Sequence, residues 1–194
     1  MGVKAENNYL TGKLLIAAPT MGDPRFHRAV IFVCSHDENG AMGLVINNAV
    51  TNVEFGDLLE QLKIESDIQI NLKEPCYTVL CGGPVETARG FLLHSPDFKR
   101  PYTMPLEAGF GLTSTVDALK DVALGHGPEH MLFALGYAGW GPRQLDEEIQ
   151  ENSWLIVDSD PNIVFNKDHT SKWQMAIQKL GIDVGRLSSL AGKA

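Results

Sequence analysis

Cysteine is scarce in this sequence, with three residues among 194. Cys34, Cys76 and Cys81 lie in apolar, strand-like runs, and no C-x-x-C motif is present. An odd number of dispersed cysteines argues against a disulfide framework and favours reduced thiols, as in the cytoplasm. Long apolar runs are also missing: no stretch approaches the ~18 residues of a membrane-spanning helix, and residues 1–13 lack the apolar segment of a signal peptide. We therefore expect a cytoplasmic protein without a membrane partner.

Basic residues are in a minority, since 16 Lys and Arg stand against 24 Asp and Glu and the formal net charge is −8. Affinity for nucleic acids comes chiefly from clustered Lys and Arg. The net negative charge therefore disfavours direct nucleic-acid binding, although a chain with this charge can still carry a small local basic patch.

Signatures of catalysis and metal binding are weak. His126 and His130 have the four-residue spacing of zinc ligands on a helix, but Gly127-Pro128 between them precludes a helix. His94-Ser95 is not part of a G-x-S-x-G nucleophile elbow, so nothing places a nucleophile beside a base. We expect no metal and no cofactor. The sequence favours a non-enzymatic protein and leaves catalysis as the alternative.

One further group, His36-Asp37-Glu38, offers a base and two carboxylates at a turn. An acid–base or metal site there would need ligands from elsewhere, such as His27 or Asp23. Because adjacent residues of a strand point to opposite sides, we interpret the group as a solvated turn.

The stretch from 131 to 154 carries the most information. Met131–Leu135 is an apolar run typical of a strand covered on both faces. A glycine-studded segment, Gly136–Gly141, follows, and then an acidic helix with Pro142 suited to its first position. The glycines could cradle a phosphate at the helix start, but their spacing is not G-x-G-x-x-G and the acidic residues repel phosphate. We favour a tight strand-to-helix turn.

Apolar runs and turn residues divide the rest of the chain. Asn39-Gly40 is a strong hairpin signal, Thr51-x-x-Glu54 is typical of a capping box, and the prolines of residues 95–109 indicate a long surface loop. Gly181 ends the last helix and places Ile182 for a Schellman contact. The expected strands are Leu14–Ala18, Ala29–Cys34, Gly43–Asn47, Cys76–Leu80, Phe91–His94 and Trp154–Val157. The other helices cover about 55–62, 115–124 and 173–180. The second of these helices is expected to have Val116, Leu119 and Ala123 on its inner face, and Asp158-Ser-Asp-Pro161 is expected to be a turn.

In this pattern, strands come first as hairpins and then alternate with helices. Cys76–Leu80 and Phe91–His94 form a second hairpin-like unit around the turn at Gly82-Gly-Pro84. Such an order predicts an α+β fold with a mixed or antiparallel sheet.

Several motifs identify a family when taken together. They are Leu14-Leu-Ile-Ala-Ala-Pro19, Met21 with Asp23-Pro24, His36 leading to Gly40-Ala-Met-Gly-Leu-Val-Ile-Asn47, Gly82-Gly-Pro-Val85, Gly90-Phe91 with His94, and Leu135-Gly-Tyr-Ala-Gly-Trp140 followed by Gln144-Leu145 and Trp154. This set resembles the AlgH/YqgE family of bacterial proteins from about Leu10 to about Ala191. The chain departs from the family motif at Arg143, where glycine is more usual, and at Asp146, where glutamate is.

The resemblance implies a single domain over 1–194, with a core at about 10–191 and loose tails at 1–9 and 192–194. The expected fold is α+β, with a mixed, mostly antiparallel coiled β-sheet built from hairpins and packed with about four helices. The family is named partly for a suggested role in transcriptional regulation of an exopolysaccharide. It supplies no agreed catalytic residues.

Three polar or glycine-rich segments are candidates for a binding site. The loop 20–28, the turn 82–84 and the segment 136–141 could converge on one pocket for a small ligand or peptide, because polar loop residues often carry function. The alternative is that each turn serves its own hairpin. The residues expected to bind the ligand are Asp23, Arg25, Arg28, Gly82, Gly83, Tyr137, Gly139 and Trp140.

We therefore predict a non-enzymatic binding or regulatory protein with an unknown protein or small-molecule partner. The alternative function is a small-molecule sensor or an enzyme that uses the pocket between the glycine-rich turns. The oligomeric state stays open.

Overall fold

The computed structural model of the chain describes residues 9–67 and 69–182. The predicted loose tails, apart from residue 9, lie outside these residues. Within them, nine strands form one sheet in the order β6-β7-β5-β8-β3-β2-β1-β9, with β4 also paired to β8. The strands are β1 (Lys13–Ala17), β2 (Val30–Asp37), β3 (Gly40–Val45), β4 (Val79–Cys81), β5 (Val85–His94), β6 (Met104–Pro105), β7 (Gly111–Thr113), β8 (Met131–Trp140) and β9 (Trp154–Asp158).

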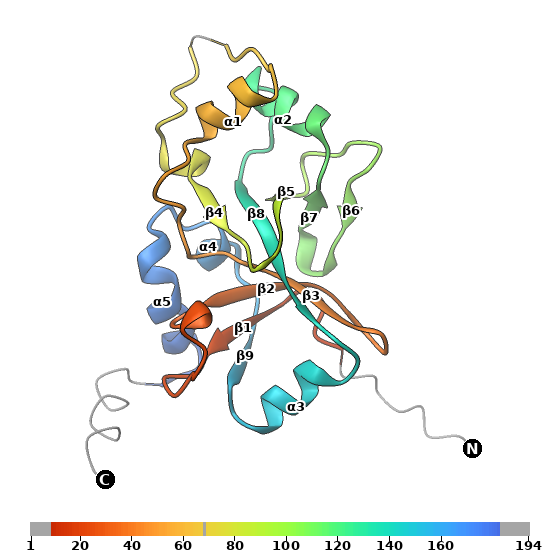
Figure 1. The fold of residues 1–194 in the computed structure, drawn as a ribbon, viewed down its shortest axis with the longest axis vertical. Helices are drawn as coiled ribbons and strands as arrows, with labels where there is room; N and C mark the ends of the chain where they lie inside the picture. Colours follow the sequence, from red (N-terminus) through yellow and green to blue (C-terminus); the bar gives the residue numbers. More distant parts are fainter. Residues whose placement is uncertain (1–8, 68, 183–194) are drawn as a thin grey trace.

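The described strands pair antiparallel, except that β4 runs parallel to β8. Figure 1 shows β8 running down the molecule from the helices α1 and α2 to α3, with α4 and α5 to one side. The fold is therefore α+β with a curled, mostly antiparallel sheet, as the sequence predicts. No helix among the described residues has both the length and the apolar character needed to cross a bilayer. The helices are α1 (Phe55–Gln61), α2 (Val116–Ala123), α3 (Gln144–Gln150), α4 (Pro161–Val164) and α5 (Lys172–Lys179).

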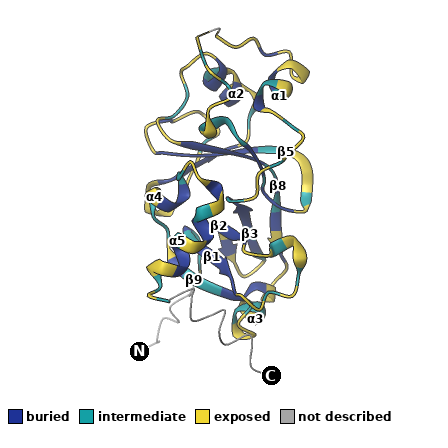
Figure 2. Cartoon of the chain, turned by 90° about the vertical axis from the view of Figure 1, so that its left-hand side faces the viewer, coloured by how far each residue is buried: buried dark blue, intermediate teal, exposed yellow. Residues whose placement is uncertain are grey.

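Leu14–Ala17 of β1 and Val30–Cys34 of β2 are apolar because both faces of this part of the sheet are covered. Leu14 belongs to the core that contains Ile177 of α5. Leu15 belongs to the core that contains Leu145 of α3. Successive strand residues point to opposite faces, so α5 covers one face and α3 the other. In Figure 2, the strands β1, β2 and β3 are mostly buried.

A buried lysine fixes α5 to the sheet. Lys172 is fully buried, and its Nζ donates to the carbonyl oxygens of Ile46 at 2.9 Å and Val164 at 2.8 Å. Burial lowers the pKa of this amine to about 7. The indole of Trp173 donates to the carbonyl of Ala17 at 2.9 Å, which adds a second link between the helix and β1.

Two local predictions are confirmed. Asp37 and Gly40 are paired at the tip of an antiparallel hairpin made by β2 and β3. At the end of α5, Gly181 has φ +72° and the N–H of Ile182 donates to the carbonyl of Ile177, which is the Schellman pattern.

The predicted glycine turn after Leu135 is wrong, because β8 continues to Trp140. Gly136 has φ +73°, and a Cβ there would lie 2.6 Å from the carbonyl oxygen of Gly83. Glycine is therefore needed where the crossing segment 82–85 touches β8, so it permits a close approach and not a chain reversal.

The predicted hairpin-like unit of Cys76–Leu80 and Phe91–His94 is also wrong. β4 lies along one side of β8 and β5 along the other, so β8 separates them. Their order in the sequence suggested that β4 and β5 are neighbours, but the segment after β4 crosses over β8 through Gly82 and Gly83.

Three predictions about helices differ from the structure. Helix α3 begins at Gln144, after Arg143 in the left-handed conformation with φ 64°, so Pro142 is not its first residue. The expected capping box at Thr51 is wrong: Glu54 precedes α1, and its N–H donates to Asp57 Oδ2 at 2.9 Å. Val116 of α2 is 46% exposed, whereas it was expected to face inward.

The sequence also missed short elements. The expected surface loop at 95–109 contains strand β6, which pairs with β7, and β7 itself was not predicted. Helix α4 stands where only a turn before Pro161 was expected. Each of these elements has two to four residues, too few to show a hydrophobic period.

Candidate functional site

Three segments that are distant in the sequence line one hollow beside the end of β8. Residues 21–26, residues 84–85 and residues 138–140 meet there, together with α3 and the start of β9. The hollow has a volume of about 560 Å³. We call it the tryptophan hollow, after Trp140 and Trp154 in its wall.

A single carboxylate organises this wall. Glu148 Oε2 accepts hydrogen bonds from the indole N–H of Trp140 at 2.9 Å and of Trp154 at 2.8 Å. Glu148 Oε1 accepts a third from Gln144 Nε2 at 2.9 Å. Both tryptophans are buried, so this acceptor satisfies two indole donors that would otherwise lack a partner. The wall is therefore held in place by the protein's own hydrogen bonds.

Residues 23 and 25, which also line the hollow, form an ion pair. Arg25 Nη2 and Nε donate to Asp23 Oδ2 at 2.7 and 3.2 Å, and the backbone N–H of Arg25 donates to Asp23 Oδ1 at 2.9 Å. The side-chain hydrogen bond from Arg25 is the main reason that the pKa of Asp23 is lowered, and the same bond raises the pKa of Arg25. Asp23 therefore stays ionised and orients the guanidinium at the mouth of the hollow.

Four of the eight predicted site residues lie together here. Asp23, Arg25, Gly139 and Trp140 line the tryptophan hollow. Arg28 points elsewhere, since its guanidinium carbon lies 5.1 Å from the ring centre of Trp173. The convergence of the three segments is a feature of the fold, and a ligand in the hollow stays a prediction.

Gly82 and Gly83 do not line the tryptophan hollow. A Cβ at Gly83 would lie 2.1 Å from the backbone carbon of Tyr137, and one at Gly82 would lie 2.3 Å from the carbonyl oxygen of Gly136. Both glycines are therefore required where the chain crosses β8, and their role is to shape the fold around the site.

Tyr137 lines a second hollow of about 510 Å³, which we call the tyrosine hollow. Met42, Phe91 and Arg89 lie in its wall, and the guanidinium of Arg89 stacks 5.1 Å from the ring centre of Phe91. Gly139 and Trp140 line both hollows, so the two cavities meet at the end of β8.

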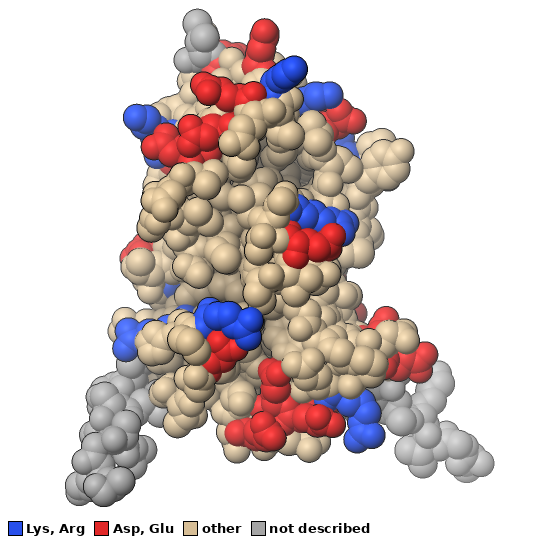
Figure 3. Space-filling model, viewed as in Figure 1, with Lys and Arg blue, Asp and Glu red and all other residues tan. Residues whose placement is uncertain are grey.

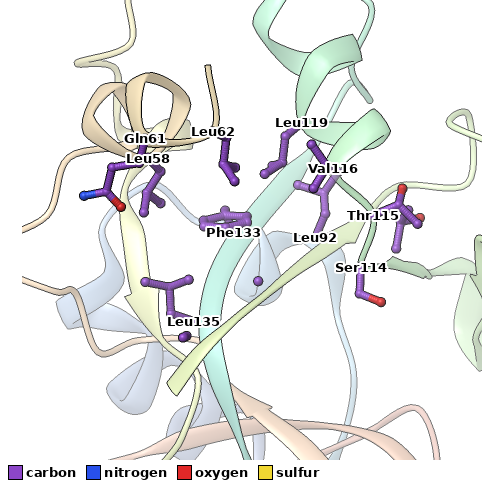
Figure 4. Close-up of a pocket in the computed structure, with 13 residues that line it drawn as sticks. Leu58, Gln61, Leu62, Leu92, Ser114, Thr115, Val116, Leu119, Phe133 and Leu135 are labelled. Atoms are coloured by element: carbon purple, nitrogen blue, oxygen red, sulfur yellow. The ribbon is translucent and has the colours of Figure 1, made fainter. Parts of the chain in front are cut away.

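A third cavity lies at the other end of β8, between α1 and α2 (Figure 4). It has a volume of about 210 Å³ and no charged residue among those that line it. Phe133 and Leu135 of β8 point into it from below, and Leu62 and Val116 lie at its mouth (Figure 4). It is uncharged and small, whereas the tryptophan hollow is larger and has charged groups at fixed positions.

The other sequence candidates do not assemble a reaction centre. His94 Nε2 lies 2.9 Å from Thr113 Oγ1 and its Nδ1 lies 2.9 Å from the Ser95 carbonyl, whereas Ser95 Oγ donates to Asp97. The serine and histidine side chains thus have separate partners. Among the described residues, no group of three or more His, Cys, Asp or Glu is placed to hold a metal ion.

The interpretation of His36 as part of a solvated turn is wrong. The ring is buried, accepts from the N–H of Leu10 at 3.2 Å and lies 3.9 Å from Asp146. Cys34 is also buried, and burial raises the pKa of its thiol to about 12, so it is a poor nucleophile.

Sequence reasoning missed Phe26, Gln144, Glu148 and Trp154 as residues of the hollow. Gln144 and Glu148 are four apart on α3, which places them on one face of a helix. That spacing indicates that the two side chains interact, but nothing in the neighbouring sequence indicates that they face two tryptophans.

The sequence pattern of the AlgH-like family matches residues 14–185. The chain belongs to the AlgH-like family. A UPF0301 protein of Afipia carboxidovorans is 51% identical over 190 residues, which covers 96% of this chain and 90% of that protein. A UPF0301 protein of Ruegeria pomeroyi is 50% identical over 186 residues, which covers 95% of this chain and 99% of that protein.

Solved structures agree with this assignment. The solution structure of the AlgH protein from Pseudomonas aeruginosa is similar with a TM-score of 0.75 and 36% identity, over 100% of both chains. A crystal structure of a protein from Corynebacterium diphtheriae has a TM-score of 0.69 and 19% identity, over 87% of this chain and 85% of that one. At that identity the second similarity concerns the fold alone.

Proposed function

We propose that this AlgH-like protein is a non-enzymatic recognition protein whose binding site is the tryptophan hollow. The observation that supports it best is the convergence of residues 21–26, 84–85 and 138–140 with α3 on one cavity. Concave sites with a few fixed polar groups among aromatic and apolar walls are typical of ligand binding. A cytoplasmic location, a single domain and a regulatory role belong to this proposal.

The state of the carboxylates favours recognition over catalysis. Glu148 accepts from three N–H donors, and Asp23 is bonded to Arg25. A general acid or base must exchange a proton with its substrate, whereas these two carboxylates already serve as acceptors for the protein itself. Regulation would then operate through a bound partner and not through direct contact with DNA, which the net charge of −8 disfavours.

The test is a capture experiment from native lysate, with proteins and small molecules both identified by mass spectrometry. The wild-type chain is compared with Arg25→Glu, which reverses a charge at the mouth of the hollow, and with Lys120→Glu, a matched reversal on the exposed face of α2. We expect at least one species to be lost with Arg25→Glu and retained with Lys120→Glu. Equal capture by all three proteins would contradict the proposal.

A further inference from the structure

Strand β8 has a free edge at its end. Along Met131–Leu135 it is flanked by β5 on one side, and β4 lies on the other side along Phe133–Leu135. The last pair with β5 joins Val85 to Tyr137, and beyond it only β3 pairs with β8, over Ala138–Trp140. Among the described strands, none lies on the β5 side of these last three residues.

The unpaired backbone groups on this edge belong to Gly139. The carbonyl of Trp140 points towards β3, since a Cβ at Gly40 would lie 2.2 Å from its oxygen. In an antiparallel strand, successive residues direct their N–H and C=O to alternate sides. The N–H and C=O of Gly139 therefore point away from β3, to the side that carries no strand. Gly139 is exposed, so another chain can reach it.

The tryptophan and tyrosine hollows meet at this edge and extend from it towards opposite faces of the sheet. Ala138 and Trp140 point to the face of the tryptophan hollow. Tyr137 points to the other face, and a Cβ at Gly139 would lie 3.4 Å from its ring on the same side. A strand added beside Gly139 would send successive side chains into the two hollows in turn.

Charge distinguishes the two hollows. The tryptophan hollow contains the carboxylates of Asp23 and Glu148 and one guanidinium, that of Arg25, among three aromatic side chains. It borders α3, which carries further acidic residues and no basic one. Figure 3 shows acidic side chains gathered over α3 at the bottom of the view. A basic side chain fits this hollow, because it meets net negative charge and aromatic rings.

The tyrosine hollow is suited to an apolar side chain. Its wall contains Tyr137, Met42 and Phe91, and its two charged residues, Asp37 and Arg89, have opposite signs. The Arg89 guanidinium also lies 3.3 Å from Glu86. In an added strand, the side chain of the residue opposite Gly139 would point to this face, and the side chains of the residues before and after it would point to the tryptophan hollow.

We propose that the free edge of β8 binds an extended segment of a partner protein, which pairs its backbone with Gly139 as an added strand. The segment has an apolar residue opposite Gly139 and a lysine or arginine next to it. Main-chain hydrogen bonds supply affinity in this mode of recognition, and the pockets for alternate side chains supply specificity. The proposal rests on the proposed function and specifies the kind of partner that the site takes.

The probe is a blocked pentapeptide, Thr-Lys-Val-Lys-Thr, added to the ¹⁵N-labelled full chain. We expect the amide signals of Gly139 and of the tryptophan indoles to shift with the same dissociation constant. Two control peptides have glutamate in place of both lysines, or an N-methyl group on the valine. Each is expected to bind about tenfold more weakly or worse, through lost charge complementarity or a lost backbone hydrogen bond.

Two variants test the backbone contact directly. Gly139→Pro removes the N–H that faces the free edge, and proline is tolerated at such edge positions. Gly139→Ala retains the N–H, and its Cβ has no contact closer than 3.4 Å. We expect about tenfold weaker peptide binding with proline and less than about threefold with alanine. Protection from hydrogen exchange at the β8 amides that face β3 shows whether the proline variant keeps its fold. The peptide with glutamate in place of both lysines gives a second test that needs no protein variant.

The outcomes separate this proposal from the one on which it rests. Absence of binding by the lysine peptide, or equal binding by the N-methylated peptide, overturns strand addition even if Arg25→Glu alters capture from lysate. A shift of the Gly139 amide with protein concentration alone would assign the edge to a second copy of this chain and would also overturn it. If Arg25→Glu leaves capture unchanged, the proposed function itself fails.

Discussion

The two halves of β8 differ although they belong to one strand. Met131–Leu135 pairs with β5 throughout and with β4 on the other side along Phe133–Leu135, and Phe133 is 3% exposed. Tyr137–Trp140 retains β3 on one side, has a hollow on each face, and includes the exposed residue Gly139. The first half is therefore used to form the core, and the second half presents backbone and side chains to a partner.

This difference arises from one crossing. The chain leaves β4 on one side of β8 and begins β5 on the other, passing over β8 at Gly136. Because Val85 is the first residue to pair after the crossing, the end of β8 lacks a neighbour on that side. The glycines that permit the crossing therefore also produce the free edge.

The largest effect is expected from the first half. Phe133→Ala should lower the free energy of unfolding by about 3–5 kcal/mol, because it removes a buried ring packed 5.3 Å from the ring centre of Phe55. Gly139→Ala in the second half should change it by less than about 0.5 kcal/mol. Urea denaturation of both variants measures the contrast. Similar losses for the two would remove the distinction between the halves.

The next largest effect concerns the wall of the tryptophan hollow. Glu148→Ala leaves two buried indole N–H groups without their acceptor, so we expect a loss of about 3 kcal/mol in the free energy of unfolding. Glu148→Gln keeps one acceptor oxygen and should lose less than half as much. Urea denaturation, monitored by tryptophan fluorescence, measures the free energy of unfolding of both variants. If Glu148→Ala is as stable as wild type, the wall is held by packing alone.

A smaller effect of opposite sign is expected where α3 begins. Arg143 has φ 64°, a conformation that costs an L-residue about 1 kcal/mol and glycine little. Arg143→Gly should therefore raise the free energy of unfolding by about 0.5–1 kcal/mol. Asn152→Gly is the matched control, since Asn152 has φ 58° and asparagine tolerates this region better. If the free energy of unfolding rises equally in both variants, arginine at position 143 is no more strained than asparagine at position 152.

The smallest effect is electrostatic and lies at the mouth of the hollow. The pKa of the Asp23 carboxyl is lowered by Arg25, so the ion pair contributes above the ordinary pKa of an aspartate and is lost as pH falls through the lowered value. In Arg25→Ala the Asp23 carboxyl should titrate at higher pH, which ¹³C NMR of the side chain detects. An unchanged titration would show that the two side chains are not paired in solution.

Sequence reasoning succeeded where the pattern is local. The β2–β3 hairpin follows from Asn39-Gly40, and the end of α5 follows from Gly181 with Ile182. It failed at Gly136, because a glycine required for a close approach and a glycine required for a turn look the same in one sequence. It also could not find that Glu148 bonds to Trp140 and Trp154, because that contact exists only once α3 has packed against β8 and β9.

Amide hydrogen exchange along β8, residue by residue, tests the central claim most directly. If the end of the strand is a free edge, the Gly139 amide exchanges at least about a hundredfold faster than those of Leu132–Leu135, while Ala138 and Trp140 stay protected by β3. Addition of the lysine pentapeptide then slows exchange at Gly139. A Gly139 amide that is as protected as the amide of Ala134 in the protein alone would contradict the account.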